Sequence, residues 1–174
     1  MKFELFPFQK KALQDCTNFI SNSKLKSGLA VVPTAGGKSV VIAKLCYELR
    51  NTPLLVIVPS EELLRQNMDA MVREGLSVSV FSASLNSKVI SNLTIATIGS
   101  LKDKGLEFKD FGIKHVIIDE AHFKFSSATT IKDDTPKDAI FKGFMKSIPA
   151  AKSFLAPCSN IRERARLLPE RAPP

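Results

Sequence analysis

Short apolar runs alternate along this chain with longer segments whose apolar positions recur at helical spacing. The runs predict buried strands, and the longer segments predict amphipathic helices. After a first helix that contains residues 5–13, the pattern predicts strands at residues 28–32, 53–59, 76–81, 92–98, 115–119 and 151–156. Between these strands it predicts helices at residues 40–49, 61–75 and 136–147, with a further short helix after residue 98.

The predicted strands are nearly all apolar, without strict alternation of apolar and polar residues. Such strands are buried on both faces, and intervening helices allow them to pair in parallel. We therefore expect an α/β fold with a mostly parallel sheet and helices on both faces. A length of 174 residues suits one core of ordinary size, and we assign residues 1–157 to this domain.

The segment VPTAGGKS, Val32 to Ser39, lies between a predicted strand and a predicted helix. Glycines allow the backbone to curl with its N–H groups pointing inward, and the following helix N-terminus favours an anion. In such a loop Lys38 would reach the β- and γ-phosphates of a nucleotide, and the Ser39 hydroxyl would bind Mg²⁺. The strict phosphate-loop pattern has glycine where this chain has Val32, and a plain Gly-Gly turn remains an alternative for this segment alone.

The segment IIDEAH, Ile117 to His122, ends another apolar run with two acids. Ligands of an open α/β sheet bind at the carboxyl ends of its strands, which is also where a phosphate loop lies. Asp119 could then bind Mg²⁺, directly or through water, while Glu120 polarises the attacking water. The alternative is a solvated acidic pair at a strand end, which the upstream phosphate-loop pattern disfavours.

These two segments resemble motifs I and II of superfamily 2 helicases and translocases, with the DEAH spelling found in type III restriction-like, UvrB-like and phage recombination helicases. LFPFQKKAL, residues 5–13, resembles the upstream glutamine motif, although Phe6 stands where the family has arginine. VIVPSEELLRQ, residues 56–66, resembles motif Ia. TIATIGSL, residues 94–101, is similar to the later strand and turn that touch the nucleic-acid backbone.

The resemblance implies a RecA-like P-loop NTPase fold, ATP and Mg²⁺ as cofactors, and the N-terminal ATP-binding half of an ATP-dependent DNA helicase or translocase. It implies that Glu120 and Lys38 are catalytic and that Ser39 and Asp119 hold the metal. It implies that the nucleic-acid backbone is contacted by Pro59, Ser60 and Thr97. The nucleotide-binding residues that it implies are Gln9, Pro33, Thr34, Ala35, Gly36, Gly37, Lys38 and Ser39.

Three of these residues also have structural interpretations. Gln9 could be a solvated polar residue on an amphipathic helix, and its proposed contact with the adenine edge comes from the resemblance. Ser60 is well placed as the N-cap of the helix that follows it, with Glu61 and Glu62 favouring the positive helix end. Both interpretations of Ser60 are compatible, because helix N-termini also bind backbone phosphates. Thr97 could be an ordinary β-branched strand residue.

A formal net charge of +8 favours a polyanionic partner, and DNA is preferred over RNA by analogy alone. Four lysines near the proposed backbone contact would supply affinity that falls with salt: Lys102, Lys104, Lys109 and Lys114. A solvated basic surface is the alternative. The chain has no Trp and one Tyr, and we expect no exposed aromatic pair, so base stacking should not dominate binding.

Cysteine and histidine usage excludes two other classes of site. Three scattered cysteines do not form a disulfide framework, and Cys16 and Cys46 follow helical apolar patterns typical of a core. Two histidines without clustered cysteines offer no zinc site. No apolar run approaches the length of a membrane span or a signal peptide. We therefore expect a cytoplasmic protein.

The C-terminal segment departs from the resemblance. Where the family has a Ser-or-Thr, Ala, Thr triplet, this chain continues APCSNIRERARLLPERAPP, and residues 159–174 hold no Lys but four Arg and three Pro. We expect the native sequence to end near Leu155, with residues 158–174 a poorly ordered, non-native extension such as a frameshift product. A natural basic tail is the alternative. DNA sequencing that shows the natural reading frame continuing through the tail would reject the first interpretation.

The family also places a second RecA-like domain opposite the first, where its arginine stabilises the transferring phosphoryl group. His122 would contact that domain. We therefore expect this chain alone to hydrolyse ATP slowly or not at all. Two other functions are compatible with the motifs: a stand-alone nucleic-acid-binding RecA-like module without productive hydrolysis, and a small-molecule kinase, which would need an acceptor site and a lid.

Overall fold

The computed structural model describes residues 4–21, 27–30, 32, 36–120, 140, 144–147 and 152–156. Several expectations lie outside these residues. They concern the polar loop after the DEAH segment, His122, Pro33, Thr34, Ala35 and the C-terminal segment from residue 157 onward.

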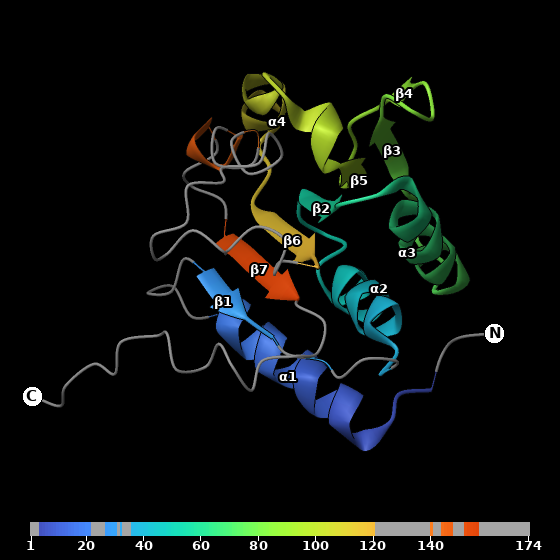
Figure 1. The fold of residues 1–174 in the computed structure, drawn as a ribbon. Helices are drawn as coiled ribbons and strands as arrows, with labels where there is room; N and C mark the ends of the chain where they lie inside the picture. Colours follow the sequence, from blue (N-terminus) through green and yellow to red (C-terminus); the bar gives the residue numbers. More distant parts are fainter. Residues whose placement is uncertain are drawn as a thin grey trace, which may run out of the picture.

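The order of helices and strands follows the prediction closely (Figure 1). The helices are α1 (Pro7–Ser21), α2 (Lys38–Glu48), α3 (Glu61–Arg73), the 3₁₀-helix η1 (Ile98–Leu101) and α4 (Gly105–Phe111). The strands are β1 (Ser27–Leu29), β2 (Leu54–Val58), β3 (Ser79–Ser82), β4 (Ser87–Lys88), β5 (Leu93–Thr97), β6 (His115–Asp119) and β7 (Lys152–Ala156). Residues 140 and 144–147 are helical, within the last predicted helix.

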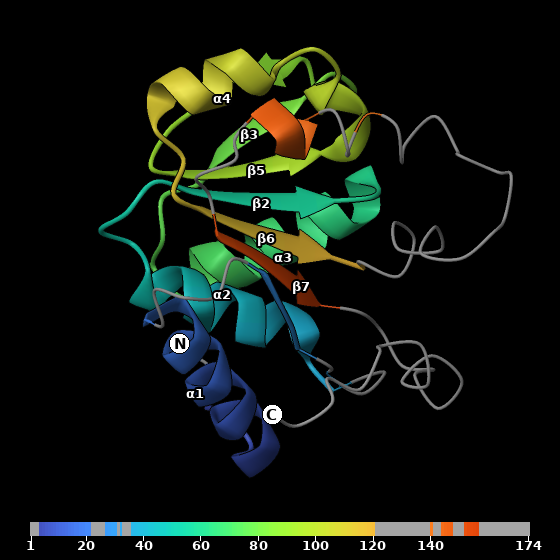
Figure 2. The same ribbon diagram turned by 90° about the vertical axis from the view of Figure 1, so that its left-hand side faces the viewer.

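The described strands form one seven-stranded sheet in the order β1-β7-β6-β2-β5-β3-β4. All pairs are parallel except β3 with the short β4. The arrowheads of β2, β5, β6 and β7 consequently point to the same side of the molecule (Figure 2). The predicted α/β fold with a mostly parallel sheet is confirmed, and the carboxyl ends of these strands share one edge.

Alternate residues of the central strands enter two separate cores. Leu54, Val56 and Val58 of β2 pack with the apolar residues of α1, α2 and α3 on one face. Leu55 and Ile57 pack on the other face with η1, α4 and Phe144. Because side chains of a strand point alternately to its two faces, a strand covered on both sides must be apolar throughout.

Some predicted boundaries differ from the structure. The predicted strand at residues 76–81 is displaced to Ser79–Ser82, and the predicted strand at residues 28–32 is Ser27–Leu29. The single short helix expected after residue 98 is two elements, η1 and α4. Asn86 has φ 48° and Asn86 N donates to the Ala83 carbonyl, which forms the turn before β4 that the pattern did not predict.

Cys16 on α1 and Cys46 on α2 are buried in the core, as predicted. Burial raises the pKa of the Cys16 thiol to about 12, with a smaller contribution from Asp15. Burial likewise raises the pKa of the Cys46 thiol. Both thiols therefore stay protonated and unreactive at neutral pH. Within the described residues, no helix combines the length and apolar character needed to cross a membrane.

Candidate functional site

The end of the phosphate-loop segment leads directly into α2. Gly37 is the N-cap residue and has φ 66°, a left-handed conformation that glycine adopts without the strain imposed by a side chain. Its carbonyl accepts hydrogen bonds from Val40 N and Val41 N at 3.0 and 3.3 Å. A Cβ on Gly37 would lie 2.6 Å from Gln9 Nε2. Lys38 and Ser39 are consequently the first two residues of the helix, at its positive end.

Lys38 contacts the two acids of the DEAH segment across 81 and 82 positions of sequence. Its Nζ lies 2.9 Å from Asp119 Oδ1 and also pairs with Glu120 Oε1. The Lys38 and Glu120 side chains are 13% and 12% exposed, and the Asp119 side chain is fully buried. The two motifs that were identified separately in the sequence therefore form one charged cluster.

The position of the sheet strands explains this contact. Asp119 is the last residue of β6, and Ile57 on β2 pairs with Ile118, so the acids emerge at the shared carboxyl edge. Asp119 Oδ1 also accepts a hydrogen bond from the backbone N–H of Glu120 at 2.9 Å. Asp119 Oδ2 accepts one from Asn67 Nδ2, also at 2.9 Å. The alternative of a solvated acidic pair is wrong for Asp119.

Glu120 has a backbone conformation that is unusual for its residue type, with φ 54°. The left-handed region costs a non-glycine residue roughly 1–2 kcal/mol, and such strain clusters at functional sites. Here it turns the chain directly after β6 and brings the Glu120 carboxylate to Lys38. Nothing in the sequence pattern distinguishes this geometry from an ordinary strand end.

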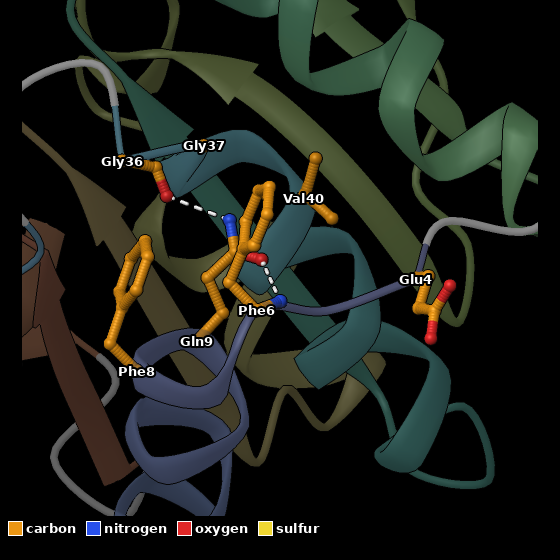
Figure 3. A pocket seen from close by; sticks show the side chains of 7 residues that line it. All are labelled: Glu4, Phe6, Phe8, Gln9, Gly36, Gly37 and Val40. Atoms are coloured by element: carbon orange, nitrogen blue, oxygen red, sulfur yellow. Dashed lines mark hydrogen bonds between the residues drawn. The ribbon is translucent and has the colours of Figure 1, made fainter.

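Gln9 is not solvated: it is 4% exposed and joins α1 to Gly36, in the segment before α2. Its Oε1 accepts a hydrogen bond from Phe6 N at 2.9 Å, and its Nε2 donates one to the Gly36 carbonyl at 2.8 Å. Figure 3 shows both bonds, with the Gln9 side chain extended toward Gly36. The interpretation of Gln9 as an exposed helix residue is therefore wrong.

A pocket of about 380 Å³ opens beside Gln9, within the size range of small-molecule sites. Figure 3 shows the side chains that line it: Glu4, Phe6, Phe8, Gln9, Gly36, Gly37 and Val40. Phe6 and Phe8 are 65% and 46% exposed, and their rings are parallel with centroids 6.0 Å apart. The expectation of no exposed aromatic pair is therefore wrong. The sequence pattern that could have revealed the pair is Phe-Pro-Phe-Gln, residues 6–9, in which two phenylalanines precede Gln9.

The residues expected to contact nucleic acid lie further along the same edge. Ser60 is exposed and caps α3, where its Oγ accepts a hydrogen bond from Leu63 N at 3.3 Å. Pro59 precedes it, and Val58 pairs with Thr97 at the ends of β2 and β5. Thr97 Oγ1 lies 2.8 Å from Ser100 Oγ and donates a hydrogen bond to Ser82 Oγ at 3.3 Å. Pro59, Ser60 and Thr97 are thus neighbours.

The charges around this edge are mixed. Glu61 begins α3, and a hydrogen bond from Arg65 lowers its pKa, with a smaller contribution from Ser84. Lys104 is paired with Glu107 at 2.6 Å. Lys114 precedes β6, where its N–H donates to the Pro53 carbonyl, so it lies at the opposite edge of the sheet. The expected cluster of four lysines near Thr97 is therefore wrong for Lys114.

Comparison with known proteins agrees with this architecture. The chain matches the family described as type III restriction enzyme, res subunit, over residues 2–146. No curated protein sequence matches it.

Three solved structures resemble the fold at low sequence identity. The UvsW helicase from bacteriophage T4 has a TM-score of 0.64 at 18% identity, with coverage of 92% of this chain and 54% of UvsW. The SWI2/SNF2 ATPase core of Sulfolobus solfataricus, solved with dsDNA, has a TM-score of 0.62 at 19% identity. The match covers 95% of this chain and 34% of the Sulfolobus chain.

The third structure is a nuclease-deletion mutant of the type ISP restriction-modification enzyme LlaGI, in complex with a DNA substrate mimic. It has a TM-score of 0.59 at 16% identity, and the match covers 90% of this chain and 17% of the LlaGI chain. This chain thus spans about half of the UvsW chain and smaller parts of the other two. The sequence match and the fold lead to one conclusion: the chain belongs to the family of the type III restriction enzyme res subunit and has the RecA-like fold of a superfamily 2 helicase domain.

Proposed function

We propose that this chain is the MgATP-binding and ATP-hydrolysing domain of a DNA helicase or translocase. The observation that carries the proposal is the cluster of Lys38, Asp119 and Glu120 at the N-terminus of α2. A cation, a buried carboxylate and a less buried carboxylate at a helix N-terminus supply the groups that phosphoryl transfer to water requires.

The residues present fit a nucleotide with magnesium. Mg²⁺ prefers oxygen ligands and is commonly bound by one or two carboxylates together with substrate phosphates. The Ser39 hydroxyl and the Asp119 carboxylate are oxygen donors of this kind, at the end of the phosphate loop and at the end of β6. Pro33, Thr34 and Ala35 would complete the loop, and Gly37 leaves no Cβ between the loop and Gln9. When bound, Mg²⁺ would neutralise charge on the β- and γ-phosphates.

The protein side chains would then act in three ways. Lys38 would exchange its carboxylate partners for the phosphates, which would leave Asp119 available as a metal ligand. Glu120 would orient and deprotonate the attacking water. Asp119 would keep its orientation, held by hydrogen bonds from Asn67 and from the backbone N–H of Glu120.

The pocket beside Gln9 is the proposed site of the adenine base. Gln9 Oε1 can accept a second hydrogen bond besides the one from Phe6 N, and adenine offers an amino donor where guanine has a carbonyl oxygen. Phe6 and Phe8 present aromatic surface for a base. We therefore expect ATP to bind more tightly than GTP.

Replacing Gln9 by glutamate tests this assignment. The carboxylate would still accept from Phe6 N but would lose the donor to the Gly36 carbonyl, so ATP affinity should fall about two- to tenfold. The preference over GTP should persist, because the carboxylate can still accept from the amino group of adenine. Fluorescent-nucleotide titration measures both effects. Gln14→Glu, an exposed change on the same helix, is the matched control. Unchanged ATP and GTP affinities in Gln9→Glu would reject the assignment.

DNA is the proposed partner along the edge formed by Pro59, Ser60 and Thr97. Support comes from the exposed N-terminus of α3, from the hydroxyl groups of Ser60 and Thr97, and from the DNA held by the Sulfolobus and LlaGI structures. Contacts of this type bind the phosphate backbone without reading sequence.

Replacing Ser60 by aspartate separates its two roles. Aspartate caps a helix as well as serine does, so thermal stability should be unchanged. Its negative charge would repel phosphate, so affinity for a DNA oligonucleotide should fall several-fold, with the difference shrinking as salt is added. Ser79→Asp, a change away from this edge on β3, controls for net charge. Equal DNA affinities of Ser60→Asp and wild type in anisotropy titrations would contradict the proposed contact.

A second function remains compatible with the same residues, namely a nucleic-acid-binding module without productive hydrolysis. The family arrangement implies a second RecA-like domain that supplies an arginine for catalysis. Adding a separately expressed second domain should therefore raise the hydrolysis rate if the first proposal is right. A rate that stays at background would favour the binding module.

A further inference from the structure

Asn67 is a fully buried polar residue that the motif comparison did not single out. It is 0% exposed on α3, one turn of helix beyond Leu63. Its Nδ2 donates hydrogen bonds to the Leu63 carbonyl and to Asp119 Oδ2, both at 2.9 Å. The amide therefore connects a helix of one core layer directly to the carboxylate at the end of β6.

The second polar atom of the Asn67 amide, Oδ1, is buried and lacks a hydrogen-bond partner within the part of the chain that the structure describes. A buried acceptor without a donor destabilises a protein, so an apolar residue at this position would serve packing alone better than asparagine does. The retained amide therefore has a role outside the packing of α3.

We infer that Asn67 is a positioning residue for the metal carboxylate Asp119. The bond to the Leu63 carbonyl fixes the orientation of the amide on the helix, and the second bond fixes Asp119 Oδ2. With Oδ2 held in this way, Oδ1 is directed to the cluster that contains Lys38. This inference rests on the proposed function, because it requires that Asp119 bind Mg²⁺ together with a nucleotide.

Hydrogen-bond partners of metal ligands have a measurable effect on metal binding. Removing such a partner typically costs 10–100-fold in metal affinity or activity. An unheld carboxylate can rotate, and it then loses the preorganised orientation that a small, geometrically demanding ion such as Mg²⁺ requires. The nucleotide itself would still contact the phosphate loop and the pocket beside Gln9.

The test measures binding of a fluorescent ATP analogue to wild type, Asn67→Ala and Asn67→Val, first in EDTA and then during a Mg²⁺ titration. In both variants we expect the affinity in EDTA to change less than twofold. The Mg²⁺ concentration for half-maximal binding should rise about tenfold or more. Asn67→Val, which leaves a smaller void than alanine, decides the question if Asn67→Ala does not fold.

Met71→Ala on the same helix is the matched control. Met71 is fully buried, so this variant loosens the packing of α3 without touching Asp119, and thermal unfolding should register the loss. Its Mg²⁺ requirement should equal that of wild type. Wild-type Mg²⁺ requirements in the Asn67 variants would overturn the inference, as would an equal rise in Met71→Ala. A wild-type chain that binds no nucleotide with or without Mg²⁺ would instead reject the proposed function, and this inference with it.

Discussion

Replacing Lys38 by methionine should lower the affinity for MgATP at least tenfold, because a hydrogen bond to a charged group contributes about 1.5–3 kcal/mol. Hydrolysis should fall by a further factor of about 10² to 10³, since the ammonium would also stabilise charge that develops on the phosphates. Methionine keeps most of the apolar stem, so packing around α2 is retained. Fluorescent-nucleotide titration and single-turnover hydrolysis measure the two effects.

Lys44→Met is the matched control for this variant. Lys44 also lies on α2 and forms a largely buried pair with Glu74, with 2.7 Å between Nζ and Oε2. Losing either lysine removes a cation from a buried carboxylate, which destabilises the fold in both variants. Only Lys38→Met should lose nucleotide binding. Equal losses of MgATP affinity in the two variants would show that the effect comes from stability and would contradict the proposed phosphate contact.

Replacing Glu120 by glutamine should abolish most hydrolysis while leaving nucleotide binding intact. General-base catalysis contributes roughly 10² to 10⁴ in rate, and the amide of glutamine cannot accept the proton from water at neutral pH. Because the shape of the side chain is unchanged, MgATP affinity should stay within about twofold of wild type. The readout is single-turnover hydrolysis with excess protein in the presence of DNA.

Glu107→Gln serves as the control for the loss of one negative charge. Glu107 pairs with Lys104 on α4, on the face of the sheet opposite α2, and this change should leave the hydrolysis rate unaltered. A Glu120→Gln variant that hydrolyses ATP as fast as wild type would assign the base to another residue. Weaker MgATP binding without a change in the rate constant would assign Glu120 a binding role.

The architecture was predictable from the sequence because both faces of the sheet are covered. Every residue of β2 is buried, so the strand appears in the sequence as a continuous apolar run, and helical spacing separates one such run from the next. The exceptions follow the same rule. β3 and β4 lie at one side of the sheet, where half-buried and exposed positions replace the continuous apolar pattern, and there the predicted boundaries were displaced or missed.

The two charged motifs were also visible in the sequence, because glycines, a lysine and paired acids at strand ends are local features. Two properties of the site were not local. Gln9 is buried because it bridges Phe6 and Gly36. Glu120 has a positive φ that the strand pattern does not indicate. The place of Lys114 was a local feature, because the predicted strand at residues 115–119 begins directly after it, and the prediction of a four-lysine cluster did not use this.

The sequence by itself determined the order of the elements, the mostly parallel α/β fold, and the presence of a phosphate-loop pattern and a DEAH segment. Each of these depends on residues close together in the chain, where periodicity and residue type are sufficient. Only the tertiary structure decided that Lys38 contacts Asp119 and Glu120, that Phe6 and Phe8 flank a pocket, and that Asn67 holds Asp119. These contacts join residues from different elements, and the pairing order of the strands and the packing of helices on the sheet bring them together.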